Sequence, residues 1–163
     1  MAEVGSVEGV DWTRLPKVAL PSGRAVNFLE AGDVIFTTRG ARNYAVALET
    51  VRAPAVCSPQ LFVIRVDDRQ ILAPTFLAWQ INQRPAQEYL KREATGSYIL
   101  NLRREVIENL PVVVPPLAQQ RAIVVYAAAV NAERQSLTKL IDNRNREMEA
   151  IAMGLHRAER HHS

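Results

Sequence analysis

An uninterrupted helical pattern over the last third of the chain constrains the fold more than any other feature. It follows Pro115 and Pro116, which favour a helix start because the first turn does not need the N–H that proline lacks. No further proline and no glycine occurs before Gly154. The pattern predicts one helix over residues 115–157, ~60 Å long at about 1.5 Å per residue, and a disordered tail over residues 158–163.

Apolar residues form a heptad seam along this helix, recurring at alternating steps of four and three. Its members are Ile123, Ala127, Val130, Arg134, Leu137, Ile141, Arg144, Met148, Ile151 and Leu155. A helix this long extends past any small domain that precedes it, so the seam predicts a partner helix. Arg134 and Arg144 interrupt the seam, and polar residues there set register or partner choice. The alternative is a helix folded back on its own domain, whose periodicity marks ordinary core.

The residues before this helix predict a small β-rich domain over residues 1–114, and the whole chain is expected to be α+β. Runs of β-branched and aromatic residues indicate three strands with short turns, which is typical of antiparallel pairing, at residues 33–38, 44–48 and 60–66. Residues 37–44 (TTRGARNY) form a polar connection between the first two strands. The first 28 residues are interpreted as loops and short edge strands.

Short helices are expected to complete this domain. Residues 75–82 and 86–93 have helical spacing and are separated by Pro85, which should end the first helix. Residues 94–102 are interpreted as a loop feeding a short strand, residues 103–109 as a single helical turn, and residues 111–114 as a short buried strand. The apolar spacing places Phe62, Trp79 and Tyr89 in the core.

The composition is that of an ordinary soluble protein, with 48% hydrophobic and 23% charged residues and a net charge of +3. Of the 20 lysine and arginine residues only Lys17, Lys91 and Lys139 are lysines. Arginine can grip a phosphate or a guanine edge with two hydrogen bonds, although GC-rich coding explains the same bias. No apolar run is long enough to span a membrane, and the single Cys57 fits a reducing compartment, so a cytoplasmic protein is expected.

The sequence contains no pattern that predicts catalysis. No glycine-rich loop carries the Lys-Ser/Thr pair that a nucleotide-binding loop needs. The histidines, His156, His161 and His162, are confined to the end of the chain, far in sequence from Cys57, so no metal-ligand spacing arises. The Asp/Asn-Pro-Pro-aromatic motif of amino-methyltransferases is also missing. A protein that is not an enzyme and holds neither a cofactor nor a metal is therefore expected.

Two segments resemble the specificity subunits of type I restriction-modification systems. Residues 29–40 (LEAGDVIFTTRG) are similar to the Gly-Asp strand and polar loop of their target recognition domains. Residues 95–123 resemble the family's run of Gly96-Ser97, a short helix and an apolar-Pro-Pro-Leu segment, ending in VVVPPLAQQRAI at 112–123. The order matches from residue 29 to residue 155. The string Pro-Pro-Leu-x-x-Gln-x-x-Ile is its most specific part.

The chain departs from the family pattern in two respects. Gln119 stands where the family usually has glutamate, which loses a charge that favours a helix N-terminus. Full specificity subunits carry two recognition domains and two long helices, whereas this chain has one of each. It is therefore interpreted as a natural half-subunit, a compact variant or a fragment.

The resemblance implies that the β-rich domain reads one half of a bipartite site in double-stranded DNA. The long helix would pair antiparallel with another helix, so that two copies present a palindromic target. Methyltransferase (modification) subunits would dock on this scaffold and flip an adenine near each half-site, with a restriction subunit as a further partner. A membrane is not expected among the partners.

The loop 37–44 is the first candidate for reading bases. Its Arg39 and Arg42 suit guanine edges or phosphates, Asn43 suits adenine, and Thr37 and Thr38 suit either. The remaining predicted DNA contacts are Tyr44 in this loop, Lys91 and Arg92 as phosphate contacts, and Ser97 and Tyr98 in the turn that follows Gly96. For each side chain the alternative is an ordinary solvated surface residue.

A second class of function fits the same chain. An assembly protein that does not bind DNA would dimerise through its heptad helix and bind protein with its β-domain. The modest net charge favours this alternative. Salt-dependent DNA affinity distinguishes the two, because only a DNA reader releases counterions on binding.

Overall fold

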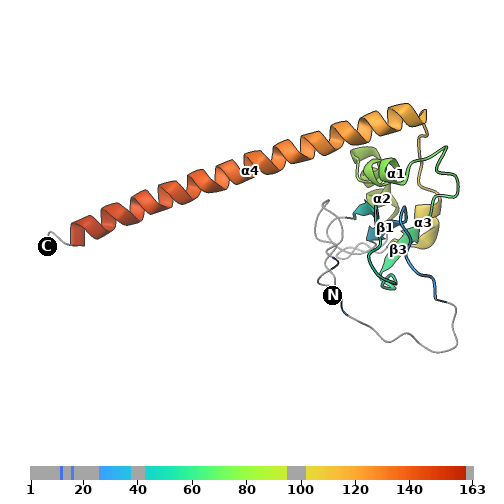
Figure 1. Ribbon diagram of the computed structural model, residues 1–163, viewed down its shortest axis with the longest axis horizontal. Helices are drawn as coiled ribbons and strands as arrows, with labels where there is room; N and C mark the ends of the chain where they lie inside the picture. The colour runs from blue at the N-terminus through green and yellow to red at the C-terminus, as the bar shows by residue number, and fades with distance from the viewer. Residues whose placement is uncertain (1–11, 13–15, 17–25, 38–42, 95–101, 161–163) are drawn as a thin grey trace. The chain divides into compact units, whose positions relative to one another are not determined.

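The structure is a computed structural model that describes residues 12, 16, 26–37, 43–94 and 102–160. The chain divides into two units, Met1–Val124 and Val125–Ser163. The first contains a small sheet and three short helices, and the second is the greater part of one long helix (Figure 1). This architecture confirms the predicted α+β class.

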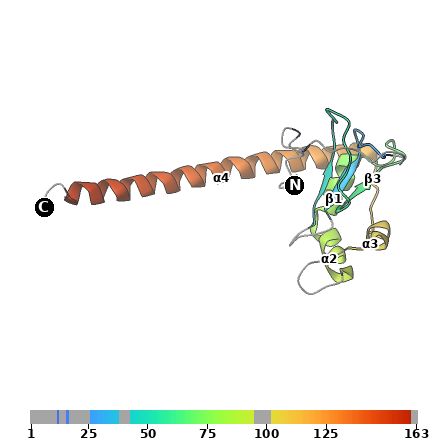
Figure 2. The same ribbon diagram turned by 90° about the horizontal axis from the view of Figure 1, so that it is seen from below.

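A three-stranded antiparallel sheet lies at the centre of the first unit. Its strands are β1 (Val34–Thr37), β2 (Ala45–Ala47) and β3 (Leu61–Ile64), in the order β2-β1-β3. Ile35 of β1 lies opposite Val46 on one side and Val63 on the other. All three strands fall within the predicted runs, and β1 and β3 lie side by side in Figure 2.

Three short helices follow β3 in the chain: α1 (Pro74–Ile81), α2 (Arg84–Glu93) and α3 (Arg104–Glu108). Helix α1 packs against β1 and β2, and α2 packs against α1 and α3. Phe62 and Tyr89 are partly buried against the core, and Trp79 stacks on buried Phe76 with the ring centroids 5.4 Å apart. The core joins β1 and β2 to α1, α2 and the residue Leu102 before α3; its other members are Val34, Phe36, Ala45, Leu77, Ala78, Ile81 and Leu90.

The predicted strand at residues 111–114 is wrong. The segment is irregular, and Val113 is 70% exposed. Its backbone pairs with a side chain in place of a strand: Gln80 of α1 donates from Nε2 to Val113 O at 2.9 Å, and Val113 N donates to Gln80 Oε1 at 2.8 Å. A run of valines indicates extended backbone, but it does not indicate which group forms the hydrogen bonds with the backbone N–H and C=O groups.

The long helix α4 (Leu117–Arg160) begins directly after the two prolines. The structure confirms a single continuous helix, which passes Gly154 and ends at Arg160, beyond the expected end at residue 157. Every described side chain from residue 128 to residue 154 is exposed. Among the described helices, none combines the length and hydropathy needed to cross a membrane.

Candidate DNA interface

The base of the β1–β2 hairpin is closed by side chains as well as by backbone. Thr37 N donates to Tyr44 O at 2.9 Å, and Tyr44 N donates to the Thr37 hydroxyl at 2.7 Å. Asn43, only 4% exposed, donates from Nδ2 to Thr37 O at 2.8 Å. Three bonds therefore fix the two ends of the loop that contains residues 38–42.

A side chain from α1 braces the outer strand of this hairpin. Asn82, the residue that follows the last turn of α1, accepts from Ala45 N at 2.9 Å and donates to Ala45 O at 2.8 Å. The amide thereby satisfies one residue's donor and acceptor on the edge strand β2, as a further strand would. The hairpin base is thus held from both sides.

The predicted base-reading residues divide into two groups. Thr37 and Asn43 use their side chains to close the hairpin, which favours a positioning role beside the loop; Tyr44 is half-buried at the same place. Thr38, Arg39 and Arg42 lie outside the described residues. Their contacts with DNA stay a prediction. The structure does define the residues on either side of this loop, Thr37, Asn43 and Tyr44.

The predicted phosphate contacts on α2 occupy its last turn. Lys91 and Arg92 are both exposed there, where positive charge also favours the helix C-terminus. The Arg92 guanidinium lies 5.7 Å from the centroid of the Tyr89 ring and 3.2 Å from a Glu93 carboxylate oxygen. Ser97 and Tyr98, which follow this helix in sequence, lie outside the described residues.

A buried carboxylate anchors the start of β1. Asp33 is fully buried, and it accepts hydrogen bonds from Arg65 Nε at 2.7 Å, from Arg65 Nη2 at 2.9 Å and from Glu30 N at 2.8 Å. Burial alone would raise the pKa of Asp33, but these bonds and the charges of Arg65 and Arg69 outweigh it and hold the pKa below 3.8. Arg65 also reaches Glu30 at 3.0 Å.

The turn before Asp33 requires glycine. Gly32 has a φ of 91°, and Asp33 N donates to Glu30 O at 3.1 Å, which fits a type II turn. The Arg69 guanidinium covers this turn and donates to Ala31 O at 2.8 Å, so a Cβ on Gly32 would lie 2.5 Å from Arg69 Cζ. The Gly-Asp pair singled out in the sequence is therefore a backbone turn followed by a buried ion pair.

One side chain fixes the first turn of α4 to the β-rich unit. Gln120 is fully buried; its Oε1 accepts from Ala73 N at 2.8 Å, while Nε2 donates to Ile71 O at 2.8 Å and to Pro115 O at 2.6 Å. The amide satisfies backbone groups on both sides of the junction. This contact gives a physical reason for the glutamine in the Pro-Pro-Leu-x-x-Gln string.

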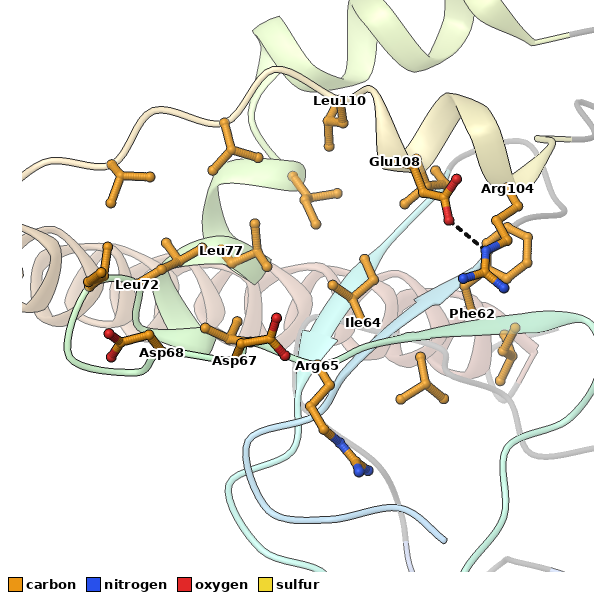
Figure 3. A pocket seen from close by; sticks show the side chains of 18 residues that line it. Phe62, Ile64, Arg65, Asp67, Asp68, Leu72, Leu77, Arg104, Glu108 and Leu110 are labelled. Atoms are coloured by element: carbon orange, nitrogen blue, oxygen red, sulfur yellow. Dashed lines mark hydrogen bonds and ion pairs between the residues drawn. The ribbon is translucent and has the colours of Figure 1, made fainter. Parts of the chain in front are cut away.

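An apolar pocket of about 800 Å³ lies between β3, α3 and the segment that follows α3. Figure 3 shows Ile64, Leu72 and Leu77 facing Leu110 across it, with Asp67, Asp68 and the Arg104–Glu108 ion pair around them. Arg65 also lines the pocket, so its rim carries charges of both signs. None of the predicted DNA contacts that the structure describes lines this pocket, and it is not counted in the candidate DNA interface.

The described residues hold no group of three or more His, Cys, Asp or Glu side chains suited to a metal ion. The described residues of the hairpin, 34–37 and 43–47, show no geometry that points to covalent or acid–base chemistry. A recognition module, whose rigid hairpin carries a polar loop and whose domain is joined to a long helix, is the class of protein that these features define.

The comparison with protein families identifies the module. Residues 20–143 match the family model described as the type I restriction modification DNA specificity domain, and the chain belongs to this family. It is a specificity component of a type I restriction-modification system. A search of curated proteins found no match.

The amides of Gln80 and Asn82 are the positioning residues that the sequence reasoning missed. Both lie in or directly after the otherwise apolar run of α1, and a polar side chain in such a run signals a buried backbone partner. The partner itself could not be predicted, because Val113 and Ala45 are distant in sequence.

Proposed function

We propose that this chain reads one half of a bipartite target in double-stranded DNA and scaffolds methyltransferase subunits in the cytoplasm, without catalytic activity of its own. The observation that carries the proposal is the fixed base of the β1–β2 hairpin, where Thr37, Asn43 and Asn82 hold both ends of the loop. Fixing both ends of the segment that carries Arg39 and Arg42 lowers the entropy cost of ordering it on DNA.

The second half of the target would come from a second copy. The seam of α4 supports a homodimer, since Leu137, Ile141 and Met148 are 52%, 60% and 65% exposed in the single chain. Two identical recognition domains related by a two-fold axis read a palindromic sequence, with a gap set by the paired helices.

The experiment is a methylation map. The chain is co-expressed with its methyltransferase subunit, and host DNA is sequenced for modified adenines, with a strain lacking the chain as the control. A palindromic gapped motif that depends on the chain supports both recognition and the symmetric dimer. An asymmetric bipartite motif supports recognition, but it indicates that a different partner, and not a second copy, reads the other half-site. A soluble, bound methyltransferase subunit with no motif overturns the proposal.

The assembly-protein alternative gains one observation from the structure, the apolar pocket whose rim carries three carboxylates, Asp67, Asp68 and Glu108, and two arginines. Such a surface suits protein better than DNA. Direct binding separates the two functions: affinity for duplex DNA that falls steeply with salt supports recognition, and affinity for protein alone supports assembly.

A further inference from the structure

The strand β3 leaves one edge of the sheet open. It pairs with β1 on one side, and within the described part of the chain no strand pairs with its other side. The outward N–H and C=O groups of an edge strand are a template for a further extended segment. The opposite edge, β2, is already braced by the Asn82 amide. The open edge of the sheet is therefore that of β3.

The apolar pocket reaches this open edge. Successive side chains of a strand point to opposite faces, so a pocket on one face of the sheet would be lined by every second residue of β3. All residues of β3 line the pocket, and Val66 continues the lining beyond the strand. Leu110 faces Ile64 from the opposite wall (Figure 3). The pocket therefore borders the backbone edge of β3 as well as one of its faces.

Apolar side chains that folding leaves exposed gather at this pocket. Among the described residues of the β-rich unit, the exposed large apolar residues outside the pocket lining are only Phe28 and Val113. Those that line the pocket are Val63, Ile71, Val112 and Val114. A contiguous group of exposed apolar side chains marks a binding surface, because its burial against a partner is favourable.

The charges at the rim of the pocket leave two carboxylates without a cation. Arg104 and Arg65 are both already paired, the first with Glu108 at 2.7 Å and the second with the buried carboxylate at the start of β1. Asp67 and Asp68 are exposed and form no ion pair with any described residue. The uncompensated charge of the rim is therefore negative, and it complements a lysine or arginine of a partner.

We propose that the open edge of β3 and the adjoining pocket bind an extended segment of another protein, which adds to the sheet as a further strand. The segment bonds to β3 through its backbone and fills the pocket with apolar side chains at every second position. It runs antiparallel to β3, as the other strands do, so a basic residue at its N-terminal end meets Asp67 and Asp68. The proposal goes beyond the proposed function and does not depend on it.

The strand register separates the acidic end of this site from the hairpin loop. Thr37, after which the loop begins, lies opposite Leu61, whereas Val34 lies opposite Ile64. The two unpaired carboxylates follow Ile64 in the chain, so they lie beyond the end of β3 that is farther from the loop. The basic end of a bound segment therefore lies at the end of the sheet opposite to the loop, and protein binding at β3 does not require the loop.

A synthetic peptide tests strand addition with the full chain. The probe is a short fluorescent peptide that begins with two lysines and continues with alternating valine and threonine, and fluorescence anisotropy gives its Kd. Two further versions carry N-methyl groups either on the valine amides or on the threonine amides. Alternate N–H groups of a strand point to opposite edges, so only one version loses the groups that face β3. We expect that version to bind about tenfold more weakly than the other.

Substitutions in the chain locate the bound peptide. Asp67→Asn with Asp68→Asn should raise the Kd about threefold to tenfold, because two exposed ion pairs are lost. Ile71→Ser should also raise the Kd, since this exposed side chain lines the pocket. The matched controls change exposed residues that do not line the pocket and should leave the Kd unchanged: Glu49→Gln with Asp142→Asn, and Ile151→Ser.

Hydrogen exchange shows whether the edge of β3 is free. The β3 amides that do not bond to β1 should exchange rapidly in the chain alone and slowly with the peptide bound. Slow exchange of these amides without peptide means that this chain or a second copy already covers the edge, and it overturns the proposal. Equal affinities of the two methylated peptides, equal effects of the aspartate variant and its control, or no peptide binding overturn it as well. None of these results involves DNA, so the methylation map tests the proposed function separately.

Discussion

At the scale of single residues, the turn at Gly32 and Asp33 restricts which residue types can occupy both positions. Gly32 has a positive φ, which strains any residue with a side chain, and a Cβ added to it would lie 2.5 Å from the Arg69 guanidinium carbon, so that Arg69 would have to move. Asp33 follows directly and is the only buried carboxylate among the described residues. A backbone requirement and an electrostatic one thus fall on neighbouring residues.

Replacing this glycine should destabilise the β-rich unit. We expect Gly32→Ala to lower the free energy of unfolding by about 1–3 kcal/mol, because the backbone conformation is strained for alanine and Arg69 must move. Urea unfolding measures the change. Gly154→Ala is the matched control: a Cβ there meets nothing within 4 Å, and alanine favours a helix over glycine. Equal effects of the two substitutions would contradict the role assigned to the turn.

Asp33 should make stability depend on pH in the acidic range. Its pKa is lower in the folded chain than the ordinary 3.8, so its ion pair stabilises the fold fully above pH 3.8. That contribution is lost as the pH falls below 3.8 through the folded pKa. Urea unfolding at pH 6, 4 and 3 should show a smaller acid-induced loss in Asp33→Asn than in the parent chain. An identical pH profile in both proteins would exclude the ion pair as its source.

Substitution of the two loop arginines, Arg39 and Arg42, tests whether the hairpin loop recognises DNA. Arg39→Ala or Arg42→Ala should cost about 1–3 kcal/mol of discrimination if the side chain contacts guanine, and should weaken binding to all sequences alike if it contacts phosphate. Binding of target and random duplexes at several salt concentrations separates these results. Lys139→Ala, on the exposed part of α4, is the control. Unchanged binding in both single variants and in the double variant would remove this loop from the interface.

At the scale of elements, side-chain amides make the junctions that backbone pairing leaves open. Asn82 completes the edge of β2, Gln80 holds the segment before α4, and Gln120 fixes the first turn of α4. An amide can do this because it offers a donor and an acceptor at once, as a peptide group does. The three amides join α1 to β2, α1 to the segment before α4, and α4 to the residues before α1.

Removing the Gln120 amide should loosen the root of the long helix. Gln120→Met keeps the length of the side chain but leaves Ala73 N and the carbonyls of Ile71 and Pro115 without their partner. We expect a loss of about 2–4 kcal/mol in the unfolding free energy of the β-rich unit, since each buried unpaired group costs about 1–3 kcal/mol. Chemical unfolding followed by tryptophan fluorescence, to which Trp79 of α1 contributes, measures it. The exposed neighbour Gln119, changed to Met, should have almost no effect.

The elements themselves were largely predictable from the sequence, and the junctions were not. Local signals, such as the run that becomes β1 or the prolines before α4, locate the strands and helices correctly. The apolar residues around Val113 satisfy the same local signal for a strand, while their real partner is an amide on α1. The hairpin loop stands out in the sequence, but the closing role of Asn43 depends on a bond to Thr37 that no local pattern encodes.

At the scale of the whole molecule, recognition and spacing belong to different units of one chain. The β-rich unit carries the hairpin, and the free length of α4 carries no recognition loop, only a seam and charges. A change in the helix should therefore alter the distance between two half-sites without altering the half-sites themselves. This separation is the strongest consequence of the proposed dimer, because an assembly protein would not show it.

Inserting one heptad into the exposed part of α4 tests this separation. A copy of residues 136–142 placed after Asp142 in both copies of the chain keeps the heptad seam in phase and adds about 10 Å to each helix. At about 3.4 Å per base pair, the gap between half-sites should lengthen by about three base pairs, while the bases of each half-site stay the same. The methylation map reads both quantities, and Gly154→Ala, which alters α4 without lengthening it, should leave the gap unchanged. A motif with its original gap would show that α4 does not set the spacing.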